Sequence, residues 1–215
     1  MSALHVFDMD GTLLRGTTAS LEISRRLGQL DELTDLEHRF ATGVIPAAGF
    51  ALEVRELWAD LDPDLVADVT AGAPWIEGIA EVCADIQERG ETSMLITLSP
   101  DFFARHLRTL GIDVVHASRF PPPPFAEPVD PAGILDPADK VRLTETERVA
   151  RDLPVDACVA YGDSMSDEPL FDHLRNTVAV NARPALEAVA RVAYRGDDLR
   201  EAYALGRSLL AREND

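Results

Sequence analysis

Short apolar runs alternate along the chain with segments in which apolar residues recur every three or four positions. The apolar runs cover residues 4–7, 94–98, 114–117, 158–161 and 178–180. Runs of this length predict buried strands, whereas the periodic segments at 77–89, 101–110, 138–152, 184–192 and 197–212 predict helices. Strands that alternate with helices in this way predict an α/β fold, a Rossmann-like doubly wound parallel sheet with helices on both faces.

The segment after the first strand has a different pattern. From about residue 18 to residue 71 the spacing is helical throughout, with breaks at glycine and proline residues, and Pro74 closes the segment. This pattern predicts three or four helices and no strand. We therefore expect a small all-helical cap at 16–74, inserted into a core that consists of 1–15 and 75–215.

Composition narrows the range of partners. The 215 residues include 38 acidic and 20 basic side chains, which gives a formal net charge of −18 at pH 7. A nucleic-acid or anionic-membrane partner normally requires a cationic surface, so we expect neither. No segment approaches the roughly 20 apolar residues of a membrane span, and the first residues do not resemble a signal peptide. We expect a cytoplasmic protein whose two cysteines stay reduced.

Polar side chains stand where three of the predicted strands end. Asp8 and Asp10 follow the first strand, Ser99 follows the second, and Asp163 and Asp167 follow the fourth. In an open parallel sheet, ligands bind at these carboxyl ends. Two like charges about 4 Å apart cost about 4 kcal/mol at an effective dielectric constant near 20, so a cluster of carboxylates implies a cation. Oxygen ligands without histidine or cysteine favour Mg²⁺.

Asp8 and Asp10 are two positions apart, which turns both carboxylates to the same side of the chain. One of them can act as a nucleophile while the other donates a proton to the leaving group. Ser99 can donate a hydrogen bond to a phosphoryl oxygen. Lys140, the single lysine among 20 basic residues, can supply positive charge. Phosphoryl transfer requires mainly positioning and charge neutralisation, and these residues offer both.

Four segments resemble, in order and spacing, the motifs of the haloacid dehalogenase superfamily, in particular its phosphoserine phosphatase-like branch. They are Phe7-Asp8-Met9-Asp10-Gly11-Thr12-Leu13, Ser99, Lys140 and Gly162-Asp163-Ser164-Met165-Ser166-Asp167. The resemblance covers nearly the whole chain, and the first and last motifs are highly specific in combination. It implies Mg²⁺-dependent hydrolysis of a small phosphorylated metabolite through an aspartyl-phosphate intermediate.

The same resemblance implies a role for each motif residue. Asp8 would be the nucleophile, and Asp10 would be the general acid and then the general base. Ser99 and Lys140 would bind the phosphate. Mg²⁺ would be held by Asp8, by the backbone carbonyl of Asp10 and by Asp163. Asp167 would support the site by hydrogen bonding or through water.

Two departures from the family pattern concern the substrate. Phosphoserine phosphatases usually have a glutamate where this chain has Thr17, and a Ser-Gly-Gly-Phe sequence where it has Ser99-Pro100-Asp101-Phe102. Both features normally help to hold the amino-acid part of the substrate. We therefore expect a small phosphomonoester with a polar or sugar-like leaving group, and phosphoserine is not the preferred substrate. Thr17 and Arg55 are the candidate substrate contacts, although Arg55 is as well explained by a surface role against a tryptophan ring.

Several alternatives remain open from the sequence. Ser99 and Asp167 could each cap the helix that follows. The chain could be a phosphotransferase or mutase of the same superfamily, or a non-catalytic member that binds a phosphorylated ligand. The sequence does not predict the oligomeric state.

Overall fold

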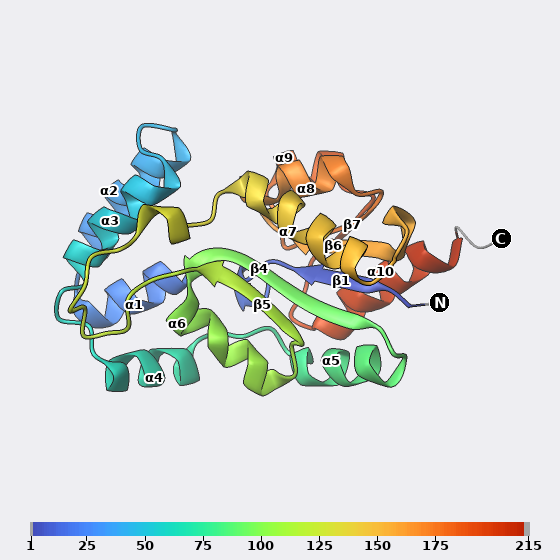
Figure 1. The fold of residues 1–215 in the computed structure, drawn as a ribbon, viewed down its shortest axis with the longest axis horizontal. Helices are drawn as coiled ribbons and strands as arrows, with labels where there is room; N and C mark the ends of the chain where they lie inside the picture. The colour runs from blue at the N-terminus through green and yellow to red at the C-terminus, as the bar shows by residue number, and fades with distance from the viewer. Residues whose placement is uncertain (1, 213–215) are drawn as a thin grey trace.

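A six-stranded parallel sheet forms the centre of the molecule (Figure 1). The computed structural model describes residues 2–212. The strand order is β5-β4-β1-β6-β7-β8, so the first strand of the chain lies between β4 and β6. The strands are β1 (Leu4–Phe7), β4 (Thr92–Pro100), β5 (Val114–Ser118), β6 (Cys158–Gly162), β7 (Asn176–Val180) and β8 (Val192–Tyr194). The switch in strand order at β1 confirms the predicted doubly wound α/β fold.

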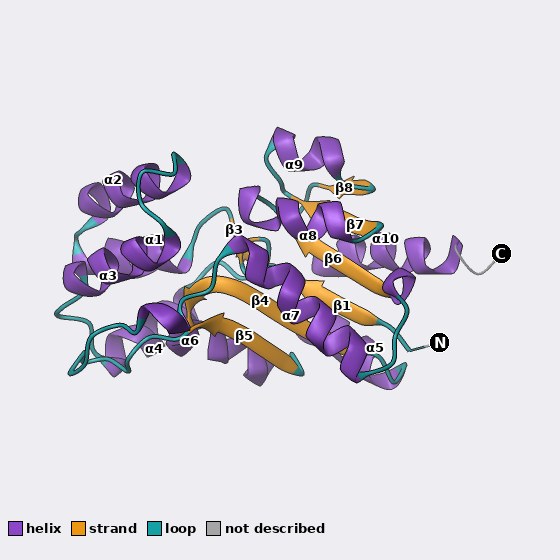
Figure 2. Ribbon diagram, turned by 45° about the horizontal axis from the view of Figure 1, so that its top comes forward, coloured by secondary structure: helices purple, strands orange, loops and turns teal. Residues whose placement is uncertain are grey.

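Helices cover both faces of the sheet (Figure 2). On one face lie α5 (Ile79–Glu88), α6 (Asp101–Ala104) and α10 (Leu199–Arg212), and on the other lie α7 (Pro137–Ala150), α8 (Glu168–His173) and α9 (Pro184–Val189). Short 3₁₀ helices occur at Arg105–Leu110, Pro131–Gly133, Val155–Ala157 and Met165–Asp167. Within residues 2–212, no helix is both long enough and apolar enough to cross a membrane.

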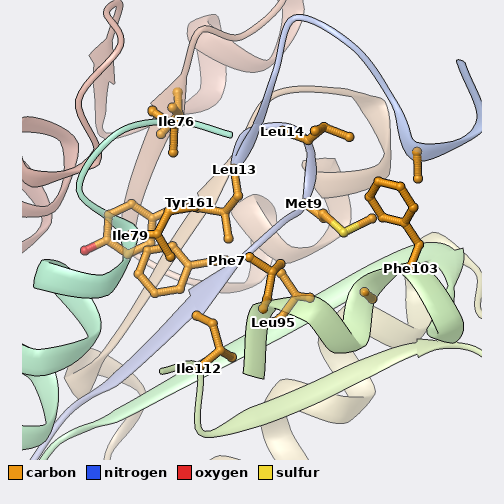
Figure 3. Close-up of a cluster of buried hydrophobic side chains, with 14 of the residues drawn as sticks. Phe7, Met9, Leu13, Leu14, Ile76, Ile79, Leu95, Phe103, Ile112 and Tyr161 are labelled. Carbon is orange, nitrogen blue, oxygen red and sulfur yellow. The ribbon is translucent and has the colours of Figure 1, made fainter. Parts of the chain in front are cut away.

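The central strands contribute to two apolar clusters, because successive strand residues point to opposite faces. In β1, Phe7 belongs to the cluster on the α5 side, whereas Val6 belongs to the cluster on the α8 side. Figure 3 shows the first cluster, in which Phe7 stacks on Tyr161 of β6 with the ring centroids 4.5 Å apart. This packing holds β1 against β6 immediately before the polar residues that end both strands.

A buried polar network ties β1 to the last helix. The ring of His5 is fully buried, and its Nε2 lies 3.0 Å from Glu91 Oε2 while its Nδ1 lies 3.1 Å from Tyr161 Oη. Arg207 of α10 donates to both carboxylate oxygens of Glu91. A buried polar group costs free energy unless it is hydrogen-bonded, so these contacts allow a histidine in a central strand.

Four helices lie beyond the carboxyl ends of the central strands, in the segment expected to be helical (Figure 1). They are α1 (Ala19–Leu27), α2 (Leu30–Ala41), α3 (Ala47–Leu57) and α4 (Pro63–Gly72). Thr18 and Asp62 cap the first and the fourth by accepting backbone N–H groups. Trp58 is fully buried and donates from Nε1 to Ser24 Oγ at 2.8 Å, which joins α3 to α1. The division into a cap at 16–74 and a core at 1–15 and 75–215 stays a prediction.

Some local predictions were wrong. The helix predicted at 184–192 ends at Val189, before β8 begins at Val192. The helix predicted at 101–110 is present over those residues, as α6 followed by a 3₁₀ helix. The two-residue strands β2 (Asp10–Gly11) and β3 (Leu14–Arg15) were not predicted. Segments as short as β2, β3 and β8 contain too few residues for a periodic pattern to show.

Candidate active site

The pairing of β1 with β6 sets the position of Asp8. Phe7 pairs with Tyr161, and the backbone N–H of Asp8 donates to the carbonyl oxygen of Tyr161 at 2.9 Å. Asp8 therefore lies at the strand end beside Gly162, one residue before Asp163. Only 6% of Asp8 is exposed. The strand register brings the first and last sequence motifs together.

Lys140 connects these two motifs. Its Nζ donates to Asp8 Oδ1 and to Asp167 Oδ1, both at 2.6 Å, and to Ser166 Oγ at 3.3 Å. The lysine lies in the first turn of α7, which begins with a capping box at Asp136. Only 1% of the lysine side chain is exposed. Burial by itself lowers the pKa of Lys140, but the two carboxylates outweigh it and raise the pKa above its usual value, so the ammonium keeps its charge.

The residues Asp8, Asp163 and Asp167 form a carboxylate cluster. Each of them offers an oxygen atom within 4.8 Å of the other two. Asp163 Oδ1 is buried and has no hydrogen-bond partner among the described residues. Burial and the neighbouring Asp167 raise the pKa of Asp163 to about 7, and the same two causes raise the pKa of Asp8. A partnerless carboxylate oxygen beside two further carboxylates suits a hard cation such as Mg²⁺.

Gly11 allows Asp163 to approach the first motif. The φ angle of Gly11 is +82°, in the left-handed region that favours glycine. A Cβ atom at this position would lie 2.1 Å from Asp163 Oδ2. The close approach of the Asp163 carboxylate therefore explains why a glycine stands at this position.

Asp10 is held by a separate set of donors. The backbone N–H of Ala19, at the start of α1, donates to Oδ1 at 2.6 Å, while Ser99 Oγ and Thr97 Oγ1 donate to Oδ2 at 2.7 Å and 3.1 Å. Burial raises the pKa of Asp10, although these hydrogen bonds lower it in part. A fixed carboxyl group with a raised pKa is suited to proton transfer. The role of Thr97 was not predicted, because a threonine inside an apolar strand has no distinctive pattern.

A cavity of about 220 Å³ lies between the strand ends and the helices α2 and α3. Polar residues from the strand ends and the last motif line one part of it, namely Asp10, Ser99, Ser164 and Ser166. Apolar side chains from the two helices and from the core line most of the rest. The carboxyl group proposed for proton transfer thus borders this cavity, next to the charged cluster.

Two charged residues of the cavity lining were not predicted. Glu37 of α2 accepts a hydrogen bond from Thr18 Oγ1 at 3.1 Å, and burial raises its pKa. Arg183, the N-cap residue of α9, is exposed. Helical periodicity shows which face of a helix is polar, but it does not show which other element that face meets.

Neither of the two candidate substrate contacts lines the cavity. Thr17 Oγ1 donates to Glu22 Oε1 at 2.7 Å. Arg55 donates from Nη2 to the carbonyl oxygens of Phe125 at 3.1 Å and Glu127 at 3.3 Å, and its guanidinium carbon lies 5.9 Å from the centroid of the Phe125 ring. Arg55 therefore fastens α3 to the loop between β5 and α7, which passes beside that helix (Figure 1).

The motif residues fall inside a match to a known protein family. The model of the haloacid dehalogenase-like hydrolase family matches residues 5–172. The chain belongs to this family. The match begins in β1 and extends into α8, so it includes all four sequence motifs around this hydrolase's carboxylate cluster.

Phosphoserine phosphatases are among the relatives of this haloacid dehalogenase-like hydrolase. It is 26% identical to a phosphoserine phosphatase of Idiomarina loihiensis, with 93% of this chain and 91% of the relative covered. A substrate-bound phosphoserine phosphatase complex has a TM-score of 0.80 at 21% identity and covers 95% of this chain and 98% of its own. A phospho-aspartyl intermediate analogue of phosphoserine phosphatase has a TM-score of 0.78 at 22% identity, with 94% and 98% covered. The solved structures share the fold, and together with the family match the relatives indicate a phosphatase of the expected branch.

Proposed function

We propose that this hydrolase cleaves a small phosphomonoester through an aspartyl-phosphate on Asp8. The observation that carries the proposal is the different environment of two carboxylates at the end of one strand. Asp8 belongs to a charged cluster with Lys140, whereas Asp10 is held by neutral donors at the edge of the cavity. This difference supports a nucleophile and a proton donor that act on the same phosphoryl group.

In the first step, a carboxylate oxygen of Asp8 attacks phosphorus, and the bond from phosphorus to the ester oxygen breaks. Asp10 gives its proton to the departing alkoxide, which leaves as the alcohol. Lys140 binds the phosphoryl oxygens, and its ammonium offsets their negative charge. Ser99, whose hydroxyl donates to Asp10 in the free protein, would turn that hydrogen bond to a phosphoryl oxygen when the substrate binds. Burial raises the pKa of Asp10, which favours a protonated carboxyl group at the start of this step. The Lys140 ammonium, 2.6 Å from Asp8 Oδ1, favours the ionised form of Asp8.

In the second step, Asp10 is a carboxylate and takes a proton from water. The resulting hydroxide attacks phosphorus, the bond between phosphorus and Asp8 breaks, and inorganic phosphate leaves. Asp8 is restored as a carboxylate, and Asp10 again holds a proton. One residue serves as acid and then as base because its hydrogen-bond donors keep it in one place.

Asp8, Asp163 and the backbone carbonyl of Asp10 would hold Mg²⁺, and Asp167 would support the site. When bound, the ion neutralises negative charge on the phosphoryl oxygens. The buried oxygen of Asp163 that lacks a hydrogen-bond partner supports this assignment. A cavity of about 220 Å³ suits a small phosphorylated metabolite. A cytoplasmic location stays a prediction.

The proposal is tested by phosphate release from a panel of small phosphomonoesters with Mg²⁺ present. Asp8→Asn is expected to lower the rate by at least about 10³, the scale of losing a covalent nucleophile. Asp172→Asn, an exposed aspartate on α8, is the matched control and keeps the activity. Full activity of Asp8→Asn contradicts the mechanism. Binding of phosphomonoesters without turnover favours a non-catalytic member, and transfer of the phosphoryl group to an added alcohol favours a phosphotransferase.

A further inference from the structure

We propose that the substrate's leaving group is an uncharged apolar body about the size of a benzene ring, such as an aryl-methyl or branched alkyl group. This inference rests on the proposed phosphatase function and names its substrate class. It differs from the polar or sugar-like leaving group that the sequence alone favoured.

The apolar part of the cavity carries the inference. Phe40 of α2 and Phe50 of α3 lie in contact, with ring centroids 5.4 Å apart, and both line the cavity. Val54, one turn further along α3, lines it too, and Phe120 and Ile134 come from the two ends of the loop between β5 and α7. A sugar or a polar amino acid placed among these side chains would lose hydrogen bonds to water. The polar partners that the described helical segment offers in the lining are Thr18, Ser20 and Glu37. An apolar group gains free energy when it is buried there.

The charged residues of the lining oppose an anionic leaving group. Among the described residues of α2 and α3, Glu37 is the only charged one that lines the cavity. Its carboxylate would repel a substrate carboxylate, and Thr18 already donates to it. Arg183 is exposed, so solvent weakens any pairing that it makes with a substrate anion. The zwitterion of phosphoserine therefore finds no buried pair of partners in this lining.

The volume of the cavity sets the size of the group. A cavity of roughly 150 Å³ lined by apolar side chains is large enough to hold benzene, and this one measures about 220 Å³. Part of that space, next to Asp10 and Ser99, must accept the phosphoryl group and the ester oxygen. The remainder fits one ring or a short branched chain.

The test compares kcat/KM of the full chain with Mg²⁺ for benzyl phosphate, 3-methylbutyl phosphate, methyl phosphate, glucose 6-phosphate and phosphoserine. Benzyl and methyl phosphate both release simple primary alkoxides, so their ratio reports mainly on contacts with the leaving group. We expect kcat/KM for benzyl phosphate to exceed that for methyl phosphate, glucose 6-phosphate and phosphoserine by at least about tenfold. If methyl phosphate, glucose 6-phosphate or phosphoserine is cleaved as efficiently as benzyl phosphate, the inference is overturned and the phosphatase function stands.

Two pairs of variants locate the effect in the cavity. Phe50→Ala is expected to raise KM for benzyl phosphate about tenfold and to leave methyl phosphate unchanged, whereas Leu52→Ala, on the same helix but 40% exposed and outside the lining, changes neither. If Phe50→Ala does not fold, Ala47→Asp in the lining replaces it, with Ala48→Asp outside the lining as its control. Both lie in the first turn of α3, where helices accept acidic residues. Equal effects of the variant and its control overturn the inference.

A binding measurement separates this inference from the proposed function. Calorimetry with Asp8→Asn compares benzyl phosphate with methyl phosphate without requiring turnover. At least about tenfold tighter binding of benzyl phosphate supports an apolar subsite, even if the wild-type chain releases no phosphate. Equal binding of the two compounds refutes the subsite, whatever the rate of hydrolysis.

Discussion

Replacing Lys140 with methionine removes the positive charge that faces Asp8 and Asp167 at 2.6 Å each. Methionine keeps most of the buried stem, so the main change is electrostatic. Without the ammonium, one of the two buried carboxylates has to take a proton from solution. At pH 7 that proton costs about 4 kcal/mol for a carboxyl group with an ordinary pKa near 3.9, at about 1.4 kcal/mol for each pH unit. This agrees with the roughly 3 to 5 kcal/mol lost when a buried ion pair loses one partner.

The expected loss of stability depends on pH in a defined direction. In the variant, the folded state binds one proton more than the unfolded state does, so its free energy of unfolding falls as the pH rises. Relative to the wild type, the loss should be about 4 kcal/mol at pH 7 and about 1.4 kcal/mol at pH 5. Urea unfolding in the presence of a chelator measures both values without a metal ion to replace the missing charge.

A second substitution serves as the control for this prediction. Adding Asp167→Asn to Lys140→Met removes a carboxylate together with its counter-charge, and we expect it to recover about half of the lost stability or more at pH 7. A loss that is the same at pH 5 and pH 7, or that Asp167→Asn does not relieve, would show that Lys140 contributes through packing and not through its charge.

Three further predictions concern the carboxylate cluster, the buried network around His5, and the contact of Arg55 with the loop between β5 and α7. Asp163→Asn is expected to raise the melting temperature in chelator, because the carboxyl group of Asp163 is costly to ionise, and to reduce the upward shift that Mg²⁺ causes; an unchanged Mg²⁺ shift would remove Asp163 from the metal site. Glu91→Gln should lower the free energy of unfolding by about 2 kcal/mol at pH 7, the scale of hydrogen bonds to charged groups. Burial raises the pKa of Glu91, but its hydrogen bonds to basic partners lower the pKa overall. The difference in stability between the wild type and Glu91→Gln is therefore present above about pH 4.5 and disappears as the pH falls through the folded-state pKa of Glu91. A difference in stability that persists in acid would contradict an ionised Glu91. Arg55→Ala should speed proteolysis of the loop between β5 and α7, whereas Arg39→Ala, which loses an ion pair to Glu53 within the helical segment, should not; equal cleavage of the two would refute the tether.

The fold was predictable because the apolar runs of the central strands end abruptly at polar residues. The run at 158–161 stops at Gly162-Asp163, and the run at 4–7 stops at Asp8. Both strands are buried on two faces, so nearly every residue in them is apolar. The sheet edge that collects the carboxylates follows from parallel pairing alone. Lys140 could be singled out because it is the only lysine in a chain rich in arginine.

The contacts that reach Asp10 and the cavity were not predictable in the same way. Ala19 meets Asp10 through its backbone N–H, which any residue except proline would offer. Glu37 and Arg183 reach the cavity from elements that are far apart in the sequence. Their positions depend on how α2 packs over the strand ends, and periodicity within one helix does not contain that information. Arg55 illustrates the same limit, since its partners are carbonyl oxygens of an irregular loop.

Because β1 lies between β4 and β6 in the sheet, the two carboxylates of the first motif have different neighbours. Thr97 and Ser99, from β4 on one side, hold Asp10, whereas the residues that follow β6 on the other side surround Asp8. Under the proposed mechanism, a substitution at Thr97 would alter proton transfer to the alcohol, whereas a substitution at Asp163 or Asp167 would alter the environment of the nucleophile.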